Sequence, residues 1–230
     1  MMKIFSILFI AAAAFMAACA DPAANKPKAE TSAPSSNTAK SSNAPTLTEA
    51  AKPGVLADFK AIGTELAITP ENSKVEFTGS KVTGKHDGGF KTFKGVIDLV
   101  GDKAETSKVL VDIDMASVFS DSDGLTKHLQ TGDFFEVEKF PKASFVSTKI
   151  ETDTAKGAGN FTVTGDLEMR GVKKSVKFPA TITITPADVA MKAEFAINRK
   201  DFGIVYAGKA DDLIRDDVVI KLDLKSARKK

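Results

Sequence analysis

The stretch "GNFTVTGDLEMRGVKKSVKFPATITI", residues 159–184, carries the pattern that decides the fold. In its first half, Phe161, Val163 and Leu167 alternate with Thr, Asp and Glu. A period of two is typical of a β-strand with one apolar and one polar face. Arg170-Gly171 interrupts the alternation, and a second alternating run follows. Two such runs around a two-residue break that contains Gly predict an antiparallel hairpin.

The same alternation continues through the chain from about Leu66. We predict eight strands, at 73–82, 90–100, 107–115, 142–150, 159–169, 173–184, 190–197 and 216–224. Short turns join most of them, including the glycine turn "HDGG" at 86–89, as in an antiparallel meander. The polar faces carry Lys, Glu, Asp and Thr, which argues against a membrane-spanning barrel. Eight strands form a sandwich or close into a barrel, and closure removes exposed edges. We therefore predict an all-β, eight-stranded antiparallel barrel.

Two segments break the strand rhythm. In "SDSDGLTKHLQTG", residues 120–132, Leu125 and Leu129 are four residues apart, which predicts a short helix with Asp123 as a possible cap. The second segment, 202–216, is predicted to be a loop, with or without one more short helical turn. Between 128 and 145 four phenylalanines follow no regular period, so this stretch is predicted to cap one end of the barrel. At least one of Phe134 and Phe135 is expected to turn into the interior, and Pro141 to precede the strand that starts near Lys142.

The N-terminal residues 1–18 are predicted to be a secretory signal. Lys3 precedes an apolar run from Ile4 to Ala18, which is short for a membrane-spanning helix. Cys19 is the single cysteine of the chain, and "FMAAC" resembles the lipobox of bacterial lipoproteins, with Met16 in the place of the usual Leu. We expect Cys19 to carry a lipid anchor; a transmembrane anchor and simple secretion are the alternatives. The resemblance implies a lipid-anchored, periplasm-facing protein of the bacterial envelope. Ala20 after Cys19 favours the outer membrane.

Residues 19–60 are predicted to be a lipidated linker without fixed structure. The run from Ala20 to Gly54 is rich in Ala, Ser, Asn, Pro and Lys and has almost no large apolar side chains. Such a segment cannot bury enough surface to offset the entropy of ordering. Residues 61–230 form the predicted folded domain, which is long enough for one core.

Composition and spacing exclude several functions. The 32 Lys and Arg residues are interleaved with 30 Asp and Glu residues, so no basic stripe indicates nucleic acid. The two His residues are not spaced as metal ligands, and "DSDG" at 121–124 lacks the later ligands of a calcium loop. No nucleophile–base arrangement is visible near the Asp pairs at 211–212 and 216–217. We therefore predict a protein that is not an enzyme and has no cofactor, and the sequence leaves its oligomeric state open.

Several motifs in the predicted domain then occur in a distinctive order. They are "GGFKTFKG", His128-Leu129, Asp133-Phe134-Phe135, Phe140-Pro141, Phe145, Gly165-Asp166-Leu167, Gly171-Val172 and Asn198 to Gly203. In this order, across about 66–227, they resemble the YceI-like family of lipocalin-like barrels that bind polyisoprenoids. This chain lacks the Trp that the family often has in its first long strand. The resemblance implies a carrier or binder of a long apolar lipid, such as a polyisoprenoid or a quinone.

Alternation also predicts which side chains face the barrel interior and could line a lipid site. They are Val75, Phe77, Phe90, Phe93, Val111, Ile113, Phe134, Phe135, Phe145, Phe161, Val163, Phe178, Ile182, Phe195 and Ile220. Possible contacts to a polar headgroup are His128, Arg199 and Arg215. The alternative is that these rings fill a solid core. The protein would then be a stress-response or protein-interaction module that uses an exposed Phe134/Phe135 patch.

Overall fold

All eight predicted strands are present in the structure, a computed structural model in which residues 21–35 and 54–228 are described. They are β3 (Lys74–Lys81), β5 (Phe93–Val100), β6 (Lys103–Asp114), β8 (Lys142–Thr152), β9 (Asn160–Met169), β10 (Val172–Ile184), β11 (Asp188–Asn198) and β14 (Asp217–Ala227). The hairpin around Arg170-Gly171 is confirmed. Met169 pairs with Val172, and both turn residues have positive φ (52° and 72°), as in a type I′ turn.

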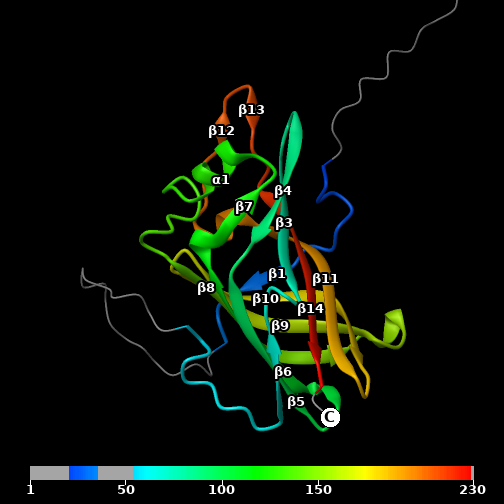
Figure 1. Cartoon of the computed structure of the whole chain (residues 1–230). Coiled ribbons are helices and arrows are strands. Elements are labelled where there is room, and N and C mark those ends of the chain that lie inside the picture. The colour runs from blue at the N-terminus through cyan, green and yellow to red at the C-terminus, as the bar shows by residue number, and fades with distance from the viewer. Residues whose placement is uncertain (1–20, 36–53, 229–230) are drawn as a thin grey trace, which may run out of the picture.

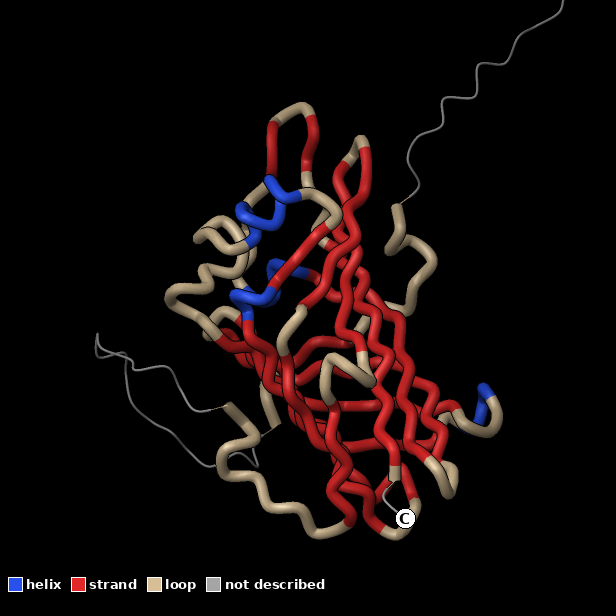
Figure 2. Tube along the Cα trace, viewed as in Figure 1, coloured by secondary structure: helices blue, strands red, loops and turns tan. Residues whose placement is uncertain are grey.

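The sheet has more strands than the eight predicted. It also contains β1 (Glu30–Ser32), β2 (Thr64–Ile68), β4 (Gly84–Phe90) and β7 (Val118–Ser120). The main sheet is antiparallel, has twelve strands and runs β2-β5-β6-β8-β9-β10-β11-β14-β3-β4-β7, with β1 paired to β10. It curls into an incomplete barrel (Figures 1 and 2), because β2 and β7, at the two ends of this order, do not pair within the described residues. The predicted fold class is therefore confirmed, and the strand count is corrected.

The predicted glycine turn at 86–89 is in fact part of a strand. β4 includes it, and the turn lies at Val82-Thr83, since Lys81 pairs with Gly84. A Cβ on Gly88 would lie 2.5 Å from the Phe77 ring and 2.4 Å from the carbonyl oxygen of Phe119. Glycine is needed here for the close approach of neighbouring strands and not for a turn.

The predicted short helix is confirmed as α1 (Asp123–Leu129), but its cap is Ser122 and not Asp123. Ser122 has an extended backbone, and its side chain accepts a hydrogen bond from the Leu125 N–H, whereas Asp123 lies in the first turn. Three short 3₁₀ segments are also present: η1 (Met115–Ser117), η2 (Thr154–Lys156) and η3 (Arg199–Phe202). The predicted loop at 202–216 contains a small hairpin of β12 (Gly208–Lys209) and β13 (Asp212–Leu213).

The described parts of the predicted linker lie on the barrel, so this prediction was wrong for 21–35 and for 54–60. Glu30 to Ser32 pair with β10. The Val55 N–H donates to Asp112 at 2.9 Å, and the Ser35 N–H donates to Asp166 at 3.1 Å. Backbone pairing and carboxylate acceptors need no apolar side chain, so composition did not signal this order. The predicted signal, Cys19 and residues 36–53 lie outside the described residues. No helix of the described chain is both long and apolar enough to cross a membrane.

The main core fills the part of the barrel farther from α1. Its rings pack tightly: Phe178 and Phe195 stack with centroids 4.2 Å apart and an interplanar angle of 10°, and Phe145 lies 5.9 Å from Phe178. A second, smaller cluster lies beneath α1 and consists of Phe77, Val118, Leu129, Phe134 and Ile204. The space between this cluster and the tips of the hairpins contains the candidate site.

Candidate functional site

An apolar cavity of about 360 Å³ lies at the end of the barrel that carries α1. It lies between the β3–β4 hairpin, α1 with the loop that follows it, and the segment from Ile204 to Ile214. Apolar side chains form most of its wall: Phe77, Phe90, Leu125, Leu129, Phe134, Phe135, Met169, Ile197, Ile204, Tyr206, Ile214, Val218 and Ile220. Its volume falls within the range of about 300–1,000 Å³ that is typical of small-molecule sites.

Three aromatic rings in contact form part of the cavity wall. Phe77 on β3 pairs across strands with Ile220 on β14. The Phe77 ring lies 6.0 Å from that of Phe90, which in turn lies 6.0 Å from that of Phe135. Strand alternation turns Phe77 and Ile220 inward from neighbouring strands, while Phe135 reaches them from the irregular loop. The rings therefore join the barrel wall to the loop that covers its end.

The stretch 130–141 covers this end, as predicted. Phe134 is buried, with 7% of its surface exposed, and Phe135 is half-buried. The His128 ring meets Phe134 edge-on at 5.0 Å and Tyr206 at 5.2 Å, and its Nε2 lies 2.7 Å from an Asp133 carboxylate oxygen. Phe134 is thus fixed in the interior, and β8 begins at Lys142 as expected. The exposed Phe134/Phe135 patch required for the protein-interaction alternative is not present.

Four polar residues of the cavity lie near the hairpin tips: Lys81, His86, Lys209 and Asp212. Asp212 joins the two hairpins, because one carboxylate oxygen pairs with Lys81 and the other accepts from the Thr83 N–H at 3.2 Å and the Thr83 hydroxyl at 2.9 Å. The hydrogen bond from Lys81 lowers the pKa of Asp212. Lys209 is exposed, so this edge is where the cavity meets solvent.

Arg199 lines the cavity but serves the protein backbone. Only 4% of its surface is exposed. Its guanidinium donates to the carbonyl oxygens of Ile204 at 2.7 Å, Arg215 at 3.0 Å and Ile214 at 3.4 Å, and to Asp216 at 3.3 Å. Burial lowers its pKa, and Asp216 partly offsets this effect. The side chain therefore holds the segment 204–216 in place, and its predicted role as a headgroup contact is not the one its bonds indicate.

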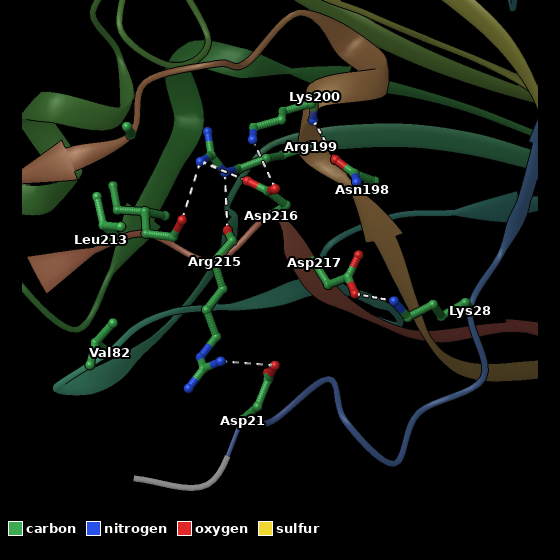
Figure 3. A pocket seen from close by; sticks show the side chains of 12 residues that line it. Asp21, Lys28, Val82, Asn198, Arg199, Lys200, Leu213, Arg215, Asp216 and Asp217 are labelled. Atoms are coloured by element: carbon green, nitrogen blue, oxygen red, sulfur yellow. Dashed lines mark hydrogen bonds and ion pairs between the residues drawn. The ribbon is translucent and has the colours of Figure 1, made fainter. Parts of the chain in front are cut away.

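Arg215, the other predicted headgroup residue, lies outside the apolar cavity. It lines a separate polar pocket of about 560 Å³ and forms an ion pair with Asp21 at 3.4 Å (Figure 3). Other charges in this pocket are also paired: Lys200 lies 2.8 Å from Asp216, and Lys28 contacts Asp217. These pairs bring the N-terminal segment, η3 and the start of β14 together.

The structure divides the residues that were predicted to line the interior. Phe77, Phe90, Phe134, Phe135 and Ile220 line the cavity, together with His128. The remaining predicted residues belong to the main core or pack against it: Val75, Phe93, Val111, Ile113, Phe145, Phe161, Val163, Phe178, Ile182 and Phe195. Core filling, which the sequence left open as the alternative, describes this second group, because its members pack in one cluster and the rings of Phe145, Phe178 and Phe195 contact one another.

Sequence reasoning missed the lining residues on irregular segments. Ile204 and Tyr206 alternate in "GIVYAG", a short apolar signal within the stretch that was predicted to be a loop. Gly79 was also missed, because a residue without a side chain has no apolar pattern. A Cβ on Gly79 would meet no atom within 4 Å, so this position leaves part of the cavity open.

Comparisons with known proteins agree with the fold. A UPF0312 protein of Pseudomonas putida (strain GB-1) is 36% identical over 140 residues, which cover 58% of this chain and 71% of that protein. The crystal structure of Burkholderia cenocepacia BcnA matches with a TM-score of 0.61 and 24% identity, over 69% of this chain and 99% of that one. A polyisoprenoid binding domain from Saccharophagus degradans matches with a TM-score of 0.55 and 17% identity, over 72% and 100%. These two structural matches show the shared fold.

The family match covers the barrel from its second strand to its last. The model of the YceI-like domain matches residues 66–226, which include both the cavity and the core. The order of motifs in the sequence, the curled antiparallel sheet and this match agree. The chain belongs to the family of proteins with a YceI-like domain.

Proposed function

We propose that the protein binds a long apolar lipid, a polyisoprenoid or a quinone-like molecule, in the cavity beneath α1, without enzymatic activity. The observation that carries the proposal is the cavity itself, whose wall is mostly apolar and aromatic and whose exposed lysine, Lys209, lies at the edge formed by the hairpin tips. Each buried methylene of a ligand contributes about 0.8 kcal/mol, so an isoprenoid segment would bind by surface burial alone. The description of the Saccharophagus degradans neighbour as a polyisoprenoid binding domain supports the same ligand class.

The placement of the core limits how the lipid binds. Because the rings below Phe77 pack against one another, the ligand occupies the capped end and not the full length of the barrel. One end of the chain lies among Phe77, Phe90 and Phe135, and the remainder leaves past the hairpin tips. A polar headgroup would then lie near Lys209 and His86 and away from Arg199, whose donors are already engaged.

We further propose that the protein is a lipoprotein of the bacterial envelope, with a signal over residues 1–18 and an acylated Cys19. Its support is the apolar run, the lipobox-like "FMAAC" and the absence of any second cysteine for a disulfide. The barrel then faces the periplasm, and Ala20 favours the outer membrane. Substitution Cys19→Ser should move the protein from the membrane fraction to the soluble fraction, and full retention in the membrane would contradict acylation.

Native extraction tests the ligand. The full chain should be purified in mild detergent from membranes that contain quinones and polyprenyl lipids, and its bound lipids identified by mass spectrometry. We expect one isoprenoid-class molecule per chain. Protein that is consistently empty, or filled only with detergent and phospholipid, would refute the proposal.

A further inference from the structure

The N-terminal segment 21–35 is built into the barrel wall. β10 pairs with β11 only from Thr181 to Ile184, so the two strands separate along the rest of β10. The N-terminal segment fills this gap: Glu30 to Ser32 pair with β10, while Ala29 and Pro27 exchange hydrogen bonds of 2.8 Å with Ala196 on β11. It therefore holds its position through backbone bonds to two strands and is not a free tether.

This segment starts beside the cavity end of the barrel. Ala23 is buried against Ala196 and Val219. Asp21 pairs with Arg215, whose N–H donates to the Ser80 carbonyl oxygen on β3 at 2.9 Å. Figure 1 shows the start of the described segment next to the β3–β4 hairpin, and Figure 3 shows Asp21 at the same pocket as Val82 and Leu213.

Exposed apolar side chains gather at the same end. The described residues include four exposed large apolar side chains: Ile62, Val82, Val205 and Leu213. Val82 and Leu213 occupy the two hairpins, which are joined by a hydrogen bond of 3.1 Å from the Val82 N–H to the Leu213 carbonyl oxygen. Val205 lies between Ile204 and Tyr206, which both line the cavity. Ile62 precedes β2 at the opposite end, since Thr64 pairs with Leu99 near the β5–β6 turn.

We infer that the hairpin end of the barrel, defined by Val82, Val205 and Leu213, lies on a lipid bilayer surface with the cavity facing it. The inference rests on the proposed lipid binding and acylation. Two residues span at most about 7 Å, so an acyl group on Cys19 is attached within that distance of Asp21 at this end. The docked segment acts as a short strap that keeps the cavity at the membrane. A lipid then passes between bilayer and cavity beside Val82 and Leu213 with little exposure to water.

Depth-dependent quenching tests the orientation. The full, acylated chain would carry an environment-sensitive fluorophore at Val82→Cys or at Ile62→Cys, in vesicles of phosphatidylethanolamine and phosphatidylglycerol with spin-labelled lipids. We expect quenching at position 82 to exceed that at position 62 several-fold. Ile62 is the matched control, because it is also apolar and is more exposed, 80% against 53% for Val82. Equal quenching, stronger quenching at position 62, or a chain that does not partition into the vesicles would overturn the inference.

Flexible insertions test the role of the strap. A Gly-Ser segment of about 20 residues inserted between Ala20 and Asp21 should abolish the difference between positions 82 and 62. The same insertion within 36–53 lies after the docked segment and should leave the difference unchanged. If the two insertions have the same effect, the strap does not set the orientation.

The bound isoprenoid lipid, here called the cargo, is measured on the same vesicles by mass spectrometry. If the barrel contains isoprenoid lipid but the quenching does not differ as expected, the orientation is refuted and the proposed function is not. Loss of the cargo refutes the proposed function.

The double substitution Val82→Asp and Leu213→Asp should slow lipid transfer from donor vesicles about 5–10-fold, whereas Ile62→Asp should not. Equal transfer rates in both variants would count against membrane contact at this end.

Discussion

At the scale of single residues, whether an aromatic ring fills the core or lines the cavity depends on how many other rings it contacts. Phe178 stacks on Phe195 and touches Phe145, so it has no free face toward a ligand. Gly79 follows Phe77 by two residues on the same inward face of β3. Because Gly79 has no side chain, the cavity next to Phe77 stays open at this position. The missing side chain at Gly79 therefore contributes to the open space of the cavity, whereas the rings of the core fill theirs.

Gly79→Leu should block the cavity. The new side chain meets no atom within 4 Å and would occupy space that a lipid needs. We expect at least a tenfold loss of bound lipid. The unfolding free energy should change by less than about 1 kcal/mol, because the new Cβ enters open space and displaces no neighbouring atom. Gly132→Leu is the control, because Gly132 also has open space but does not line the cavity. Unchanged lipid content in Gly79→Leu, measured by mass spectrometry, would place the ligand elsewhere.

Arg199→Met should destabilise the segment 204–216. The substitution leaves three carbonyl oxygens, one of them in a buried hydrogen bond, without their guanidinium donor, and it removes one of the two cationic partners of Asp216. We expect a loss of about 3 kcal/mol in unfolding free energy, measured by urea denaturation. Arg215→Met removes one partly exposed ion pair and should cost less than about 1 kcal/mol. Equal effects of the two substitutions would contradict the structural role assigned to Arg199.

At the scale of elements, the cavity edge is built from two hairpins that belong to different sheets: β3–β4 is part of the main sheet, and β12–β13 is not. β12 and β13 form their own small sheet, and Asp212 attaches it to the tip of the β3–β4 hairpin through Lys81 and Thr83. On the opposite side, His86 contacts the Asp121 carboxylate at 2.8 Å and so ties β4 to the segment before α1. Polar contacts therefore hold the elements around an apolar site.

Acid should weaken the contact that Asp212 makes between the two hairpins. The pKa of Asp212 is lowered, chiefly by its hydrogen bond from Lys81, so its contribution is fully present above the ordinary Asp pKa of about 3.9. This contribution is lost as the pH falls through the lower pKa of the folded state. Hydrogen exchange at the Thr83 amide, after correction for its intrinsic pH dependence, should therefore accelerate only below about pH 4. In Asp212→Asn this amide should already exchange faster at pH 7 and lack the acid transition, while the Ala196 amide stays unchanged. A transition that persists in Asp212→Asn would assign it to another carboxylate.

At the scale of the whole molecule, the barrel is an incompletely paired sheet completed by a distant segment. β2 and β7 do not pair with each other within the described chain, and β10 and β11 separate where the N-terminal segment inserts. An unpaired strand edge leaves backbone groups without partners and invites association with other chains. The strap therefore stabilises the wall as well as linking it to the predicted anchor.

Ala29→Pro should detach the strap. Proline removes the N–H that donates to Ala196 at 2.8 Å, and its ring restricts the backbone between the two paired strands. We expect a loss of about 1–2 kcal/mol in unfolding free energy and faster hydrogen exchange at Lys177, which pairs with Glu30, and at Ala196. Ala33→Pro, just beyond β1, is the control and should leave both unchanged. If Ala29→Pro behaves like the control, the strap makes no energetic contribution to the wall.

The sequence by itself determined the eight long strands, the hairpin at Arg170-Gly171 and the short helix. Each depends on a local signal, namely alternation with a period of two, a Gly turn, or Leu125 and Leu129 spaced for one helix face. The four phenylalanines without a period predicted the cap with at least one of Phe134 and Phe135 inside. Only the tertiary structure decided that Gly88 and Gly89 lie in a strand, that residues 27–32 close the wall, and that Phe77 lines a cavity while Phe145 fills the core. Both rings face inward with the same alternation, so the difference lies in the partners that strands distant in sequence bring to each of them. Backbone pairing needs no side-chain pattern, which is why the docked N-terminal segment left no signal in the composition.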